Sequence, residues 1–122
     1  MTLSPENARI HMRTRMLYGD EIAIGPGKAI LLESIAEKGS ISAAAKHMNM
    51  SYRRAWLLVD TMNRCFASPL VISSTGGKHG GGAHLSPLGI EVLKDYRAME
   101  AELSTLSSAH LKRLKKHLIT VA

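Results

Sequence analysis

The sequence predicts a mainly α-helical fold with small β hairpins and a long helix near its C-terminal end. Apolar residues recur at intervals of three and four residues in several segments, which is the period of a helix with one buried face. Two short apolar runs flank a glycine-rich stretch at residues 76–82, as in a hairpin with a long tip. At 122 residues and 45% hydrophobic content, the chain can build one core and one association surface.

Composition restricts the partner and the compartment. Lysine and arginine number 16 against 10 aspartate and glutamate, and the net charge of +6 favours a polyanion without separating DNA from RNA or anionic lipid. Cys65 is the single cysteine, which rules out an intrachain disulfide and favours a reducing compartment. The sequence lacks both a run of roughly 18 apolar residues and a secretory signal pattern. We therefore expect a cytoplasmic protein without a membrane partner.

The first part of the chain predicts a tail and a hairpin. Residues 1–8 are polar and aperiodic, which indicates a flexible tail. Positions 10, 12, 14 and 16 (Ile, Met, Thr and Met) then alternate with basic side chains, the pattern of a half-buried strand. Gly19-Asp20 supplies a turn, after which residues 21–24 can pair back.

The next segments predict helices with identifiable ends. Pro26 suits the first turn of a helix that Gly39 ends. Ser42 is expected to cap a short second helix, Asn49 tolerates a left-handed turn, and Ser51 can cap a third helix. The expected helices span residues 26–37, 43–48 and 52–66.

The second and third of these helices have the side chains of a helix-turn-helix. That motif needs a small residue where the helices touch, a turn residue with positive φ, and apolar anchors for the second helix. Ala45, Asn49, Met50, Ala55 and Leu58 meet these needs in order. With these residues turned inward, we predict that DNA is contacted by Ser42, Ser51, Tyr52, Arg53, Arg54 and Trp56.

The chemistry of these side chains suits a duplex. Arginine can pair with guanine or hold a phosphate, and Trp56 can pack on a sugar or a thymine methyl group. In isolation, surface arginines are usually solvated and a lone tryptophan usually belongs to a core. The register therefore supports a DNA role more strongly for Arg53 and Arg54 than for Trp56.

The glycine-rich segment is predicted to form a wing between strands at residues 70–72 and 84–85. It does not fit a nucleotide triphosphatase loop, because Lys78 is followed by His79 rather than serine or threonine. In a wing, Thr75 and Lys78 would reach the duplex. A flexible linker and a small anion-binding sensor remain the alternatives for this loop.

A helix that opens at Ser86-Pro87 carries a seam for another helix. Its apolar residues recur with spacings of four, three, four and three: Val92, Tyr96, Met99, Leu103 and Leu106. We expect this seam to form a homodimer, and the basic residues 110–122 to extend the helix or fray. The expected organisation is a tail at 1–8, a winged helix-turn-helix at 9–86, and a dimerisation helix with a basic extension at 87–118.

Metal and catalytic sites have little support. The six histidines are scattered, and no pair has a ligand spacing accompanied by cysteines or carboxylates. Neither a nucleophile elbow nor a paired-carboxylate pattern occurs. We therefore expect no metal, no cofactor and no enzymatic activity.

Several motifs together resemble a known family. The chain is similar to the N-terminal DNA-binding domain of the molybdate-responsive regulators (ModE family), itself similar to LysR-type DNA-binding domains. The likeness covers roughly residues 20–105 and rests on the segments 39–45, 51–56, 62–63, 75–78, 80–82 and 85–89. It implies a dimer joined through the helix after the wing, with the helix that begins near Tyr52 as the DNA reader.

The family resemblance also sets an expectation about sensing. The chain stops where the oxyanion-binding domains of the longer proteins would begin, so we expect a short form without a small-molecule effector site. A stand-alone protein, sensing through a partner, and a fragment of a longer protein remain open.

The overall hypothesis is a bacterial, homodimeric, sequence-specific transcriptional regulator that is connected with molybdate metabolism. The alternatives are a protein-interaction module that uses the late helix and the anion sensor described above.

Overall fold

The computed structural model describes residues 2–74 and 81–121 and separates into two compact units, residues 13–96 and the two ends of the chain, residues 1–12 and 97–122. Helices predominate, with two small hairpins, as predicted. The elements are η1 (Pro5–Asn7), β1 (Met16–Tyr18), β2 (Glu21–Ile24), α1 (Pro26–Lys38), α2 (Ile41–His47), α3 (Tyr52–Cys65), β3 (Val71–Ser74), β4 (Gly82–Leu85) and α4 (Pro87–Lys115).

The strand predicted from the alternation at positions 10–16 is wrong for most of its length. Only Met16 belongs to a strand, and Ile10 and Met12 are exposed in a segment without regular structure. The turn at Gly19, with φ +60°, is confirmed, and β1 and β2 form an antiparallel pair. An alternating sequence becomes a strand only where a partner strand supplies hydrogen bonds, and the four residues of β2 reach no further than Met16.

The predicted limits of α1 are confirmed within one residue. Pro26 begins the helix, and Gly39 ends it with φ +79°, the left-handed conformation that glycine adopts without steric cost. The predicted cap of α2 is wrong by two residues. Ser40 is the cap, because its Oγ accepts a hydrogen bond of 3.0 Å from the Ala43 amide, and Ser42 lies within the helix.

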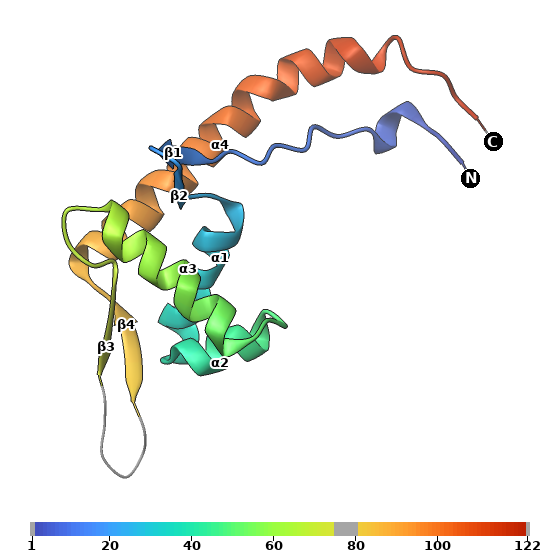
Figure 1. Ribbon diagram of the computed structural model, residues 1–122. Coiled ribbons are helices and arrows are strands. Elements are labelled where there is room, and N and C mark those ends of the chain that lie inside the picture. Colours follow the sequence, from blue (N-terminus) through green and yellow to red (C-terminus); the bar gives the residue numbers. More distant parts are fainter. Residues whose placement is uncertain (1, 75–80, 122) are drawn as a thin grey trace. The chain divides into compact units, whose positions relative to one another are not determined.

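Helices α1, α2 and α3 pack together, and the β3–β4 hairpin extends beside them (Figure 1). Alanines allow α2 and α3 to approach closely, because Ala44, Ala45 and Ala55 bury their short side chains completely or almost so. The fully buried large side chains complete this core: Leu31, Leu32, Ile35, Met62 and Leu70. Two predicted anchors, Met50 and Leu58, remain partly exposed.

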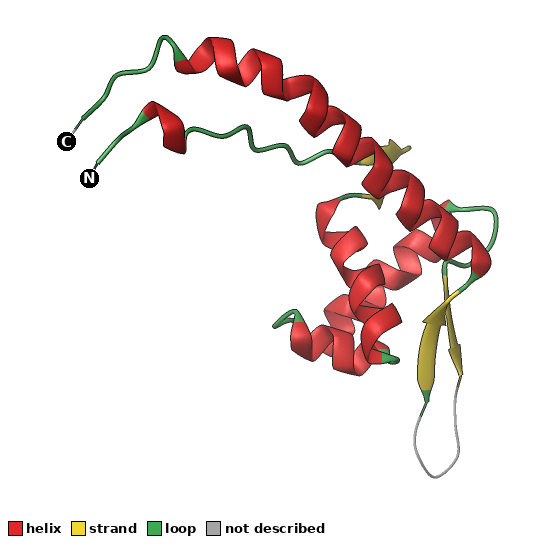
Figure 2. Ribbon diagram, turned by 180° about the vertical axis from the view of Figure 1, so that it is seen from behind, coloured by secondary structure: helices red, strands yellow, loops and turns green. Residues whose placement is uncertain are grey.

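The β3–β4 hairpin is antiparallel, with Val71 opposite Leu85 and Ser74 opposite Gly82 (Figure 2). Asn63 of α3 holds its base, since Asn63 Oδ1 accepts hydrogen bonds from the Leu70 amide at 2.8 Å and the Val71 amide at 3.1 Å. Asn63 Nδ2 also donates to the Val71 carbonyl at 3.1 Å. The side chain of Asn63 thereby fixes the position of the start of β3 relative to α3.

The start of α4 lies against the residues that precede β3. The Ser86 hydroxyl donates to the Pro69 carbonyl at 2.6 Å, and the Ser86 amide donates to the Leu70 carbonyl at 2.8 Å. A Cβ at Gly89 would lie 2.2 Å from that carbonyl oxygen. Glycine at this position is therefore required by space.

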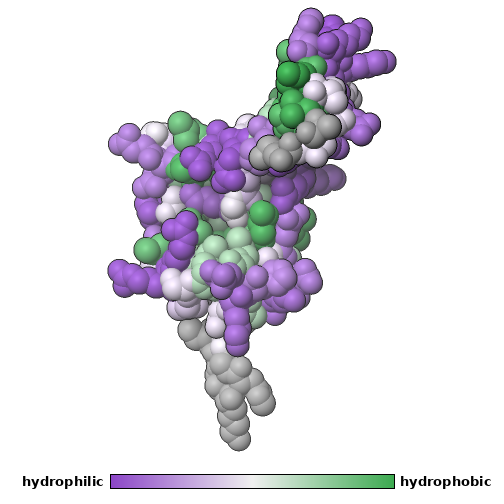
Figure 3. Space-filling view, turned by 90° about the vertical axis from the view of Figure 1, so that its right-hand side faces the viewer, coloured by the Kyte–Doolittle hydropathy of each residue, from purple (hydrophilic) through white to green (hydrophobic). Residues whose placement is uncertain are grey.

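The unit formed by the two chain ends contains no fully buried side chain among its described residues. Leu3 and Val121 exchange two backbone hydrogen bonds, of 2.7 and 2.9 Å, as an antiparallel bridge. Figure 3 shows apolar side chains gathered in this unit. The C-terminal part of α4 extends to Lys115, so much of the basic segment that begins at residue 110 is helical.

Candidate functional site

The corner between α2 and α3 has the backbone geometry that the sequence predicts. Asn49 is the single non-glycine residue with positive φ among the described residues, at +57°. The Met50 amide donates to the Ala45 carbonyl at 2.9 Å, which closes the turn. Ser51 then caps α3, because its Oγ accepts a hydrogen bond of 3.1 Å from the Arg54 amide. The positive φ of Asn49, the Met50–Ala45 hydrogen bond and the Ser51 cap thus set the direction in which α3 begins.

The first turns of α3 present polar and aromatic side chains to solvent. Arg53 and Arg54 are exposed, and neither is ion-paired to a carboxylate within the described part of the chain. Tyr52 is 55% exposed and Trp56 is 47% exposed. A tryptophan left so accessible is unusual for a core residue and resembles the aromatic anchors of binding surfaces.

A cavity of about 500 Å³ lies between the start of α2, Tyr52 of α3 and the β3–β4 hairpin. Its walls are rich in hydroxyl groups, which can donate to phosphate oxygens. The predicted residues Ser42 and Tyr52 both line it, and Ser51 is exposed nearby in sequence. Ser40, Ser73 and Ser74 contribute as well, and none of the three was predicted. The predicted wing residues Thr75 and Lys78 lie outside the described residues.

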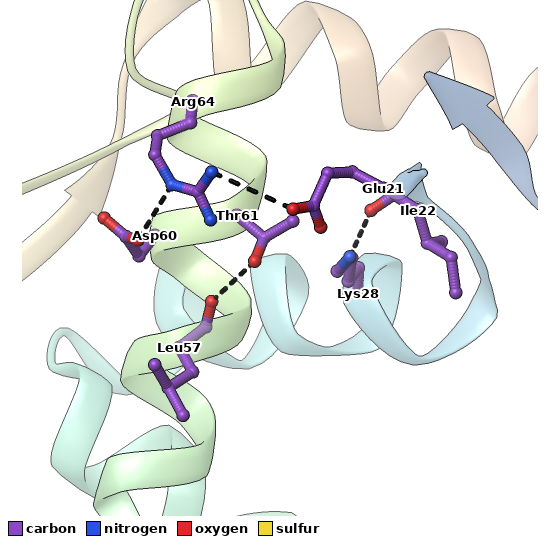
Figure 4. Close-up of polar contacts among 7 residues, drawn as sticks. All are labelled: Glu21, Ile22, Lys28, Leu57, Asp60, Thr61 and Arg64. Carbon is purple, nitrogen blue, oxygen red and sulfur yellow. Dashed lines mark hydrogen bonds and ion pairs between the residues drawn. The ribbon is translucent and has the colours of Figure 1, made fainter. Parts of the chain in front are cut away.

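Further along α3, the arginine side chain is already engaged (Figure 4). Arg64 Nε donates to Asp60 Oδ2 at 3.0 Å, and its Nη1 lies 3.9 Å from Glu21 Oε1. The hydrogen bond to Asp60 raises the pKa of the Arg64 guanidinium above its ordinary value. This end of the helix is therefore held by internal ion pairs, whereas the arginines of its first turn are free to meet a ligand.

The predicted seam of α4 includes side chains in very different environments. Tyr96 is buried and donates from its hydroxyl to the Thr14 carbonyl at 2.7 Å, so it contributes to the fold of its own chain. Val92, Met99 and Leu103 are half-buried. Leu106 is 68% exposed and therefore accessible to a partner.

Neither a metal-ligand cluster nor a membrane-spanning helix is found in the part of the chain that the structure describes. No group of three or more metal-ligating side chains occurs in residues 2–74 and 81–121. Among the helices of those same ranges, none combines the length and the apolar character needed to cross a bilayer.

Comparison with known proteins adds an independent observation. The chain is 43% identical over 91 residues to the molybdenum-pterin-binding protein MopB of Rhodobacter capsulatus, covering 75% of the chain and 34% of the relative. It is 38% identical over 94 residues to the molybdenum transport protein ModE of Azotobacter vinelandii, with 77% and 35% covered. The DNA-binding transcriptional dual regulator ModE of Escherichia coli is 42% identical over 71 residues, with 58% and 27% covered.

These similarities are partial. The chain spans about a third of the length of the curated relatives it matches, and no family model matches it. The relatives are named as molybdenum-binding and regulatory proteins, and none of these names denotes an enzyme. The chain is therefore related in sequence to a segment of molybdenum-pterin-binding and ModE proteins, and this segment makes up about one third of their length.

Proposed function

We propose that this chain is the winged helix-turn-helix DNA-binding part of a ModE-type transcriptional regulator and that it acts as a homodimer. The observation that carries the proposal is the α2–α3 corner, where Asn49 and the Ser51 cap turn Tyr52, Arg53, Arg54 and Trp56 toward solvent. A helix that begins in this way can place its first turns in the major groove.

Three further features support the same function. The serine-lined cavity between the start of α2, Tyr52 and the hairpin offers hydroxyl groups that can donate to a phosphate backbone. The net charge of +6 favours association with a polyanion. One relative, ModE of Escherichia coli, is a DNA-binding transcriptional dual regulator.

Selection from a pool of random duplexes tests the proposal. We expect enrichment of one roughly palindromic motif whose half-sites lie about one helical turn apart, ~34 Å. Arg53→Ala and Arg54→Ala should each weaken binding to that motif by about 1 to 3 kcal/mol while the fold is retained. Arg9→Ala removes the same charge from an exposed position outside α3 and serves as the control.

The outcomes separate the alternatives. Equal loss in the α3 variants and in the control would remove Arg53 and Arg54 from the reading surface. Absence of any duplex binding by the wild-type chain would overturn the DNA-binding proposal and favour a protein-interaction module that uses α4.

The dimer is proposed to use the exposed members of the α4 seam, of which Leu106 is the most accessible. Leu106→Lys should shift the chain to a monomer in analytical ultracentrifugation with an unchanged circular dichroism spectrum. A variant that sediments as the wild type does would place the dimer contact elsewhere.

A connection with molybdenum is proposed from the relatives' names alone. Sequencing of genomic fragments bound by the chain tests it, since we expect the neighbouring genes to concern molybdenum uptake or use. Bound fragments whose neighbouring genes have no relation to molybdenum would contradict the proposed connection and leave the DNA-binding proposal intact.

A further inference from the structure

A second, smaller cavity opens on the other flank of the first turns of α3, and its lining is strongly basic. Its volume is about 210 Å³, below the roughly 300 to 1,000 Å³ of pockets for drug-sized ligands. Four of its ten lining residues are cationic: Arg13, Arg15, Lys28 and Arg54. No carboxylate belongs to the described lining, although the carboxylate of Glu21 acts on Lys28 from outside the pocket and partly offsets its charge.

Lys28 gives this pocket a buried cation with spare donors. The residue is only 9% exposed, and its ammonium donates to the Ile22 carbonyl, its one hydrogen bond within the described part of the chain (Figure 4). An ammonium has three N–H donors, so two remain for a ligand. Burial lowers the pKa of Lys28 below its ordinary value, because water solvates the charged ammonium less well there.

Gly25 leaves space for the side chain of Arg15. A Cβ at Gly25 would lie 3.1 Å from Cγ of Arg15, so the absence of a side chain there makes room for Arg15. Gly25 also precedes α1, whose N-terminal end faces the same pocket through Pro26 and Gly27. The partial positive charge of a helix N-terminus adds to the field of the four cations.

We propose that this basic pocket binds one phosphate-type oxyanion. Two sources share that chemistry: a backbone phosphate of a duplex bound along α3, and a free tetrahedral oxyanion. The first source rests on the proposed function, because Arg54 belongs both to this pocket and to the proposed reading surface. The second source does not depend on DNA binding.

The test compares two double variants that remove the same charge. Arg13→Gln with Arg15→Gln strips two exposed cations from the pocket, and Arg9→Gln with Lys116→Gln strips two exposed cations that are not part of its described lining. A third variant, Lys28→Met, removes the buried ammonium. A bound duplex could contact this ammonium only by placing a phosphate in the pocket. Circular dichroism without added oxyanion establishes that each variant is folded.

The first measurement is the melting temperature in sodium phosphate, sulfate or molybdate against sodium chloride at equal ionic strength. Exclusion of these anions from the protein surface raises the melting temperature of every variant by the same amount. A stabilisation that is lost in the pocket variants and kept in the control supports the pocket with a free oxyanion as its ligand.

The second measurement is the salt dependence of binding to the selected duplex. Loss of one phosphate contact reduces the slope of log K against log salt by about 0.9. A reduction of that size in the pocket variants beyond the control supports the pocket with a DNA phosphate as its ligand. Pocket variants that match the control in both measurements, or Lys28→Met that behaves as the wild type does, would overturn the proposal. A wild-type chain that binds no duplex refutes the proposed function, and the melting measurement then decides the pocket alone.

Discussion

The two compact units of this chain use apolar residues in opposite ways. In residues 13–96, the large apolar side chains of α1 and α3 are fully buried, with Leu31, Ile35 and Met62 inaccessible to solvent. In the unit of the two chain ends, no described side chain is fully buried, although the C-terminal part of α4 carries leucines at helical spacing. Leu106 and Leu114 are exposed there.

This difference in burial bears on which residues stabilise the chain itself and which leave apolar surface exposed. A helix in water depends on packing of its apolar face, and an exposed cluster of apolar side chains marks an interaction surface. Residues 13–96 therefore contain the buried core of the chain, and the unit of the chain ends leaves apolar area exposed, which we propose is used by a second copy. Substitutions of equal size should have unequal effects in the two units.

The largest contrast is expected from loss of buried volume. Met62→Ala should lower the free energy of unfolding by about 3 kcal/mol, because it removes contacts of a fully buried side chain and leaves a cavity. Leu114→Ala, in the other unit, should change it by less than about 0.5 kcal/mol. Urea denaturation measures both. Similar losses in the two variants would mean that the unit of the chain ends has a core of its own.

An added methyl group sharpens the contrast within residues 13–96. Gly89→Ala should cost about 2 to 3 kcal/mol, because its Cβ would overlap the Leu70 carbonyl oxygen. Gly27→Ala meets no atom within 4 Å and should stabilise α1 by up to about 0.5 kcal/mol. Thermal unfolding of both variants measures the difference. A neutral Gly89→Ala would show that α4 can shift away from β3 at little cost.

Removal of the Asn63 side chain, which holds the base of the β3–β4 hairpin, is expected to have the next largest effect on stability. Asn63→Ala should cost about 2 kcal/mol, since the backbone amides of Leu70 and Val71 lose their acceptor. Asn7→Ala, an exposed asparagine in the other unit, is the control and should be near neutral. Urea denaturation gives the size, and hydrogen exchange at Leu70 and Val71 should accelerate in Asn63→Ala alone. Unchanged exchange would contradict a clamping role.

The smallest expected difference in stability is between Ser40, which caps α2, and Ser42, which lies within it. Ser40→Ala should lower the free energy of unfolding by about 1 kcal/mol, because α2 loses the acceptor for its Ala43 amide. Ser42→Ala should change it by less than about 0.5 kcal/mol, since its side chain is exposed within the helix. The comparison is made by thermal unfolding under identical conditions. A greater loss in Ser42→Ala would restore the cap expected from the sequence.

The sequence by itself determined the local features of this protein. Pro26 and Gly39 mark the ends of α1, Asn49 takes the left-handed turn, and Ser51 caps α3, all as predicted. Such features depend on interactions between residues three or four positions apart, which a pattern of residue types records directly. The outward set at the start of α3 follows from them, because a helix start and a buried stripe fix which side chains face solvent.

The tertiary structure alone decided which distant residues meet. Alternation at positions 10–16 could not reveal that β2 is too short to pair with them. A lone tryptophan at position 56 is more often core than surface by composition, and only the packing of α3 leaves it exposed. The basic pocket joins Arg13, Lys28 and Arg54 from three separate segments. These outcomes depend on contacts between residues far apart in the chain, where the fold, and no local pattern, sets the neighbours of each side chain.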